Sequence, residues 1–110
     1  MEITDVKVKR VKSDGNMKGI AHVTFDDVFV VHDIKVIVPT NGKEPFIAMP
    51  SKRDPKKGIW RDIVHPIKDK ENPTARDFRA ELANAIFEKF NALPEDDAEA
   101  IDAEDVDGIE

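Results

Sequence analysis

The sequence predicts an α+β protein in which a mainly antiparallel β-sheet of about five strands is followed by one C-terminal α-helix packed on the sheet. Three observations lead to this prediction. Apolar and polar residues alternate in the first half of the chain, the links between expected strands are too short for a crossover helix, and one late stretch has helical periodicity. A chain of 110 residues can bury one modest core, so we expect a single folded domain over residues 1–94.

The first expected strand shows the alternation and one interruption of it. Val6 and Val8 share a face, and the apolar phase then changes at Val11, which predicts a bulge near Lys9 and Arg10. A turn signal, SDGN, follows this strand, and the next two strands should form an antiparallel hairpin. The expected strands span residues 2–12, 17–26, 28–38, 46–49 and 59–64.

The helix is the clearest single element of the sequence. Thr74 is the expected N-cap, with Asp77 as its capping-box partner, and Pro94 ends the helix. Phe87 lies outside the apolar stripe, and it is either a partner contact or a residue at the edge of a wide core. The stripe, which should lie across one face of the sheet, consists of Phe78, Leu82, Ala85, Ile86, Phe90 and Leu93.

The two ends of the chain differ strongly in charge. Residues 1–94 hold all 17 Lys and Arg against 14 Asp and Glu, whereas residues 95–110 hold nine acids and no base. A segment so rich in like charge cannot bury enough apolar surface to offset its ordering entropy, so residues 95–110 should form a disordered acidic tail. This tail is either a solubilising device or an intramolecular decoy for the basic surface of the domain.

Several function classes are excluded or disfavoured. The absence of cysteine rules out disulfides, thiolate zinc sites and a cysteine nucleophile. No signal peptide or membrane-spanning run is evident, so we expect a cytoplasmic protein that does not enter a membrane. His32 and Asp33 should point to opposite faces of a strand, and His32 and His65 should be structural. We therefore expect no enzyme, cofactor, metal site or small-molecule substrate.

The loop SKRDPKKG, residues 51–58, is strongly basic although the whole chain carries a formal net charge of −6. Cations at this density attract phosphate groups, so the loop is either a site for binding DNA or RNA or only a solvated turn. Trp60 is either a stacking surface for a base or a tryptophan of the core or of an interface. The candidate phosphate contacts are Lys52, Arg53, Lys56, Lys57 and Arg61.

Three segments carry a resemblance to a known family. They are VVHDIKVI (residues 30–37), FIAMPSKR (46–53) and RDIVHPI (61–67), in this order and spacing. With the similar opening residues 1–34, they resemble the stage V sporulation protein G family, the SpoVG septation regulators, over residues 1–92. The chain departs from that family in PTNGKEP before Phe46, in the extra lysines of DPKKGIW and in the acidic tail.

The resemblance implies a small bacterial regulator of septation or sporulation that binds DNA or RNA and forms a homodimer through its β-sheet. It implies no enzymatic activity and no cofactor. With this function in view, Arg76 and Arg79 at the helix start are the second candidate for phosphate contact. The other function class left open is a non-catalytic adaptor that docks partner proteins on its sheet edges and on the outer helix face with Phe87.

Overall fold

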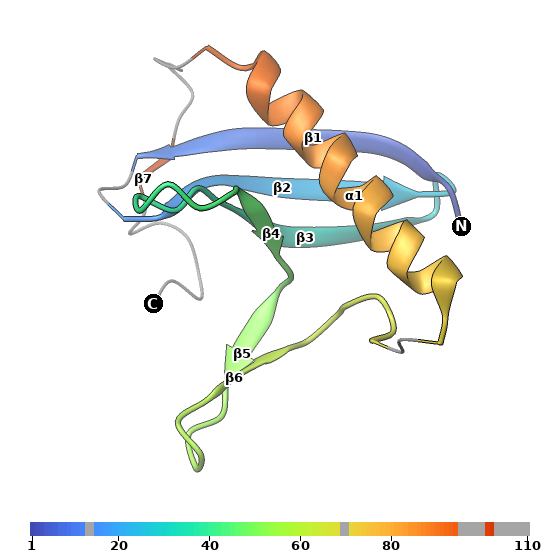
Figure 1. Ribbon diagram of the computed structural model, residues 1–110. Helices are drawn as coiled ribbons and strands as arrows, with labels where there is room; N and C mark the ends of the chain where they lie inside the picture. Colours follow the sequence, from blue (N-terminus) through green and yellow to red (C-terminus); the bar gives the residue numbers. More distant parts are fainter. Residues whose placement is uncertain (13–14, 69–70, 95–100, 103–110) are drawn as a thin grey trace.

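The computed structural model describes residues 1–12, 15–68, 71–94 and 101–102, and it confirms the α+β fold with one helix after the sheet (Figure 1). The main sheet is formed by β1 (Ile3–Lys12), β2 (Met17–Phe25), β3 (Phe29–Ile37) and β4 (Phe46–Ala48). The remaining elements are β5 (Ser51–Arg53), β6 (Trp60–Asp62), α1 (Pro73–Ala92) and β7 (Ile101–Asp102).

The main sheet is an antiparallel meander in the order β4-β3-β2-β1, as the short links predict. β7 extends it at the β1 edge, where Ile101–Asp102 pairs in parallel with Val11 and Lys12. These two residues belong to the predicted tail. Residues 95–100 and 103–110 lie outside the described part of the chain, so the disorder of the tail stays a prediction.

The fifth predicted strand does not join the main sheet. Instead, β5 and β6 pair only with each other and form a separate two-stranded ribbon, which we call the arm (residues 51–62). Pro50 separates β4 from β5, and a proline has no N–H with which to continue a ladder. Its carbonyl accepts the Ile63 N–H at 2.7 Å, which closes the base of the arm. The arm projects away from the sheet (Figure 1).

The bulge predicted near Lys9 and Arg10 is wrong. Both residues pair in register with β2, and the register shift of β1 lies between Ile3 and Asp5. The apolar phase changes at Val11 because this side chain is buried on the sheet face opposite α1. There it belongs to a small second cluster with Met17, Ile20 and Ile37.

The predicted helix cap is also wrong by two residues. Asn72 is the N-cap, because its side-chain oxygen accepts the N–H of Ala75 at 3.0 Å. Pro73 follows as the first helical residue, where its missing N–H leaves no hydrogen bond unmade. The Asn–Pro pair therefore begins the helix before Thr74 is reached.

The core lies between α1 and one face of the sheet. Leu82, Ile86 and Phe90 are the buried residues of the helix, and they belong to the predicted stripe. Phe87 is partly buried and packs against this core, which supports its interpretation as a residue of the core edge. The sheet contributes Ala21, Val23, Phe25, Val31, Ile34, Val36 and Ile47, and Met49 joins the core directly after β4.

Two residues of the sheet adapt it to the C-terminal half of α1. Gly19 lies under Phe90, whose ring would be 2.9 Å from a Cβ at this position, so only glycine allows this approach. The Arg10 guanidinium stacks on the same ring at 4.4 Å. Its Nη2 donates to the carbonyls of Phe90 at 3.4 Å and Leu93 at 3.1 Å, and so caps the negative end of the helix.

Candidate nucleic-acid interface

Asp54 organises the turn at the tip of the arm. Its backbone N–H donates to the Ile59 carbonyl, and its own carbonyl accepts the N–H of Gly58, each at 2.8 Å. Gly58 has a φ of 66°, a left-handed conformation that glycine adopts without strain. The Asp54 Oδ1 atom accepts the N–H groups of Lys56 at 2.9 Å and Lys57 at 3.3 Å. These hydrogen bonds fix the conformation of the turn. The side chains of Lys56 and Lys57 are exposed.

Like charges face each other across the arm. Lys52 and Arg61 are direct partners in the β5–β6 ladder, and both side chains are exposed. Directly opposed like charges destabilise an antiparallel pair. The Asp54 Oδ2 atom, 3.6 Å from the Arg61 Nε atom, offsets part of this repulsion. A bound phosphate between the two cations would remove more of it.

Most cations of the arm have no acidic partner. Among the described residues, no carboxylate lies within ion-pair distance of Lys52, Arg53, Lys56 or Lys57. The second acid of the arm, Asp62, pairs instead with Lys68 at 3.4 Å. Five of the predicted contacts therefore share one projecting ribbon, and four of these cations are available to an anion.

The two predicted contacts on the helix are placed differently. Arg79 donates from Nη2 to the Ile47 carbonyl at 3.3 Å and so ties α1 to β4. Arg76 is exposed, with its Nε atom 3.9 Å from the Asp77 carboxylate. The start of α1 lies apart from the arm (Figure 1), so the structure does not bring the seven residues into one surface.

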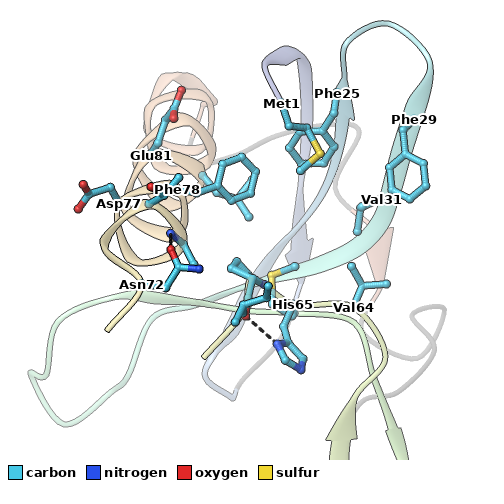
Figure 2. A pocket seen from close by; sticks show the side chains of 16 residues that line it. Met1, Phe25, Phe29, Val31, Val64, His65, Asn72, Asp77, Phe78 and Glu81 are labelled. Carbon is cyan, nitrogen blue, oxygen red and sulfur yellow. Dashed lines mark hydrogen bonds between the residues drawn. The ribbon is translucent and has the colours of Figure 1, made fainter. Parts of the chain in front are cut away.

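An apolar groove of about 860 Å³ lies between the first half of α1, the β2–β3 hairpin and the segment after the arm (Figure 2). Phe25, Phe78 and Val64 are among its walls, and Asp77 and Glu81 come from the helix. No group of three or more His, Cys, Asp or Glu side chains that could hold a metal ion occurs in the described parts of the chain. Because the exposed cations lie together on the arm, we place the candidate site there.

A pair of histidines lies on the sheet face opposite α1. The Nδ1 atoms of His22 and His32 are 3.0 Å apart, because a bulge with Asp33 at a φ of 63° brings the two rings together. The alternation of side chains that the sequence analysis assumed for His32 and Asp33 fails at this bulge.

Burial lowers the pKa of His22, and so does the nearby His32 ring, while Asp33 acts in the opposite direction. Protonation of His22 at acid pH therefore favours unfolding, because the unfolded chain binds that proton more readily.

The described part of the chain contains no helix long and apolar enough to cross a lipid bilayer. His65 has a local contact, as predicted for a structural histidine, since its Nδ1 atom lies 2.7 Å from the Pro66 carbonyl oxygen.

The sequence analysis did not predict the roles of Arg10 and Asn72 at the two ends of the helix. An Asn followed by Pro at the start of a helix could have indicated Asn72 as the N-cap. No local sequence pattern indicates that Arg10 contacts the end of the helix.

Comparison with known proteins decides the family. The sequence model of SpoVG matches residues 1–92, which include the whole sheet of four antiparallel strands, the arm and α1. The chain belongs to the SpoVG family. The match contains all seven predicted contact residues and ends at the last residue of the helix.

Curated SpoVG relatives are similar over most of their length. A "Putative septation protein SpoVG" from Acetivibrio thermocellus is 46% identical over 93 residues, which are 84% of this chain and 88% of the relative. One from Desulforudis audaxviator is 49% identical over 90 residues, 82% of this chain and 91% of the relative. "Putative septation protein SpoVG 2" from Listeria monocytogenes is 40% identical over 109 residues, 99% of this chain and 97% of the relative. These relatives are named as septation proteins and not as enzymes.

Proposed function

We propose that this SpoVG family member is a bacterial regulator of septation that binds DNA or RNA through the arm. The observation that carries the proposal is the set of four exposed cations without an acidic partner among the described residues, on a ribbon that projects from the domain. The names of its relatives support the link to septation. In this proposal the regulator is not an enzyme and is located in the cytoplasm.

Phosphate is the ligand that this geometry suits best. The side chains of Lys52 and Arg61 lie side by side on one face of the ribbon, and the turn adds Lys56 and Lys57 beyond them. Contacts from lysine and arginine to phosphate carry no sequence information, so the arm supplies affinity and position on the nucleic acid. The negative charge of the whole chain does not prevent this, because charges more than about 10 Å away are largely screened at physiological salt.

The salt dependence of binding separates this proposal from the adaptor alternative. Each phosphate contact releases counterions, so the logarithm of the binding constant should fall by about 0.7 to 0.9 per contact for each tenfold increase in salt. Four contacts predict a slope of about −3 in a titration of a labelled oligonucleotide with the protein. A salt slope near zero, together with a protein ligand whose affinity does not change with salt, would favour the protein-interaction adaptor.

We also propose that the protein is a homodimer formed through the sheet. α1 covers only one sheet face, and the opposite face exposes Val30 by 45% and Phe46 by 51%. Exposed apolar surface and an open β4 edge favour association with a second copy. Light scattering at high micromolar concentration should give twice the mass of the chain. A strictly monomeric mass under these conditions would contradict the dimer.

A further inference from the structure

Trp60 is the single tryptophan of the chain, and it stands on the arm directly across from Arg53. The ring is partly buried, yet it belongs to neither of the two apolar clusters of the described residues. Trp60 is therefore not a core tryptophan, which was one of the interpretations that the sequence allowed. Because Trp60 lies on a projecting ribbon, the remaining interpretation is that it contacts another molecule.

The polar and aromatic parts of Trp60 have no partner within the described part of the chain. No hydrogen bond to its indole N–H and no ring stacked on it occurs there, and the single guanidinium on an aromatic ring is that of Arg10 on Phe90. The N–H of a buried tryptophan usually finds a hydrogen-bond partner, and tryptophans are enriched at interfaces with other molecules. The exposed part of the ring can thus meet a ligand beside the cations of the arm.

We infer that Trp60 is a stacking surface for an unpaired base, so that the arm selects single-stranded nucleic acid. This inference rests on the proposed function and names its ligand class. Alternate residues of the ribbon point to opposite faces, so the Arg53–Trp60 pair and the Lys52–Arg61 pair lie on different faces. A flexible single strand can place a base on the first face and its phosphates along the second.

A duplex fits this arrangement less well. Bases inside a duplex are stacked on both sides, so none of them offers a face to an aromatic side chain, whereas a single strand can turn its bases out. A two-stranded ribbon does fit the major groove of DNA, and this is the competing mode of binding. In that mode Trp60 would meet base edges or sugars and would not stack.

The fluorescence of the protein reports on this contact directly, because Trp60 is the only emitter of its kind. The test titrates the full chain with oligothymidylate of about 12 nucleotides, with an abasic strand of equal length and with a duplex of equal length. We expect strong quenching by oligothymidylate alone. Binding of the abasic strand should leave the emission nearly unchanged, since it has phosphates but no bases.

Variants at this position separate stacking from phosphate contact. Trp60→Ala should weaken binding of the single strand about 5- to 150-fold, which is the range of one stacked base. Its salt slope should equal that of the native protein, because no phosphate contact is lost. Trp60→Phe keeps an aromatic face and should retain most of the affinity, whereas Trp60→Leu, which keeps apolar bulk alone, should not.

Different failures have different meanings. Tight binding of the single strand without quenching, or equal loss of single-strand and duplex binding in Trp60→Ala, would overturn the stacking inference and leave the proposed function intact. A change of oligomeric mass in Trp60→Ala would assign the ring to a protein contact and overturn it as well. If the native protein binds none of the three ligands, both the inference and the proposed function are wrong.

Discussion

Replacing Lys52, Arg53, Lys56 and Lys57 together by alanine is expected to weaken the binding of every nucleic-acid sequence by about 600- to 4000-fold at about 0.1 M salt. The reason is the loss of four phosphate contacts, each of which contributes just under one logarithmic unit at this salt concentration. The same change should reduce the magnitude of the salt slope by about 3, so that only the contribution of Arg61 remains. Fluorescence anisotropy with a labelled oligonucleotide measures both quantities.

A matched variant controls for the change in net charge. It replaces four exposed lysines outside the arm by alanine and so makes the chain more negative by the same amount. Because these lysines lie on β1, in the β3–β4 loop and on α1, their loss should change binding only a few-fold. If the control loses as much affinity as the arm variant, the phosphate contacts lie on the body of the domain. The four lysines are Lys7, Lys9, Lys43 and Lys89.

The arm variant should remain folded. Its four side chains are exposed and form no ion pair with the described residues, and exposed charges contribute little to stability. Removing Lys52 also ends its repulsion with Arg61. Circular dichroism and the urea midpoint should therefore match the native protein, so that a loss of binding reports on contacts alone.

The largest expected effect on stability comes from Ile86→Ala. Ile86 is 0% exposed and lies in the core between α1 and the sheet. Truncation leaves a cavity in a close-packed interior, so the free energy of unfolding should fall by about 2 to 5 kcal/mol. For a domain of this size, that is a large share of a total stability of roughly 5 to 15 kcal/mol. Urea denaturation followed by circular dichroism measures the change.

Glu88→Ala is the control on the same helix. Glu88 is exposed, so its removal should change the free energy of unfolding by less than about 0.5 kcal/mol. Similar small changes for both variants would mean that α1 does not pack its Leu82, Ile86 and Phe90 side chains on the sheet. Such a result would contradict the architecture described above.

The elements that the sequence predicted are those with strong periodicity. Alternation in the first two strands and the stripe from Phe78 to Phe90 reflect which face of each element is buried. Burial of apolar side chains is the main driving force of folding. It therefore favours an apolar residue at every second position of a strand and at every third or fourth position of a helix. The fold class follows from these patterns together with the short links.

The features that the sequence did not predict depend on contacts between distant residues. Val11 breaks the alternation because it packs on the second sheet face, which a single strand cannot reveal. Arg10 serves the end of a helix 80 residues later in the chain. The arm separates from the sheet at Pro50, and local patterns cannot distinguish this from a fifth strand of the meander.

The same limit applies to the candidate site. The five cations of the arm are neighbours in sequence, so their grouping was predictable from spacing. Arg79 stays a predicted contact with an exposed side chain, and the structure adds that its Nη2 atom donates to the Ile47 carbonyl of β4, a partner set by the packing of the helix. This hydrogen bond depends on the fold, so the sequence alone could not distinguish Arg79, which bonds to the sheet, from Lys52 or Arg53 on the arm.

Contact between the arm and phosphate can be observed for each residue in solution. Titration of the isotope-labelled protein with a single-stranded oligonucleotide, followed by amide chemical shifts, maps the contact residue by residue. We expect the largest shifts within residues 52–61, with Lys7 and Lys9 on the sheet and Arg76 on the helix nearly unmoved. Saturating shifts on the sheet face or at the helix start, with the arm unchanged, would show that the arm is not the site of phosphate contact.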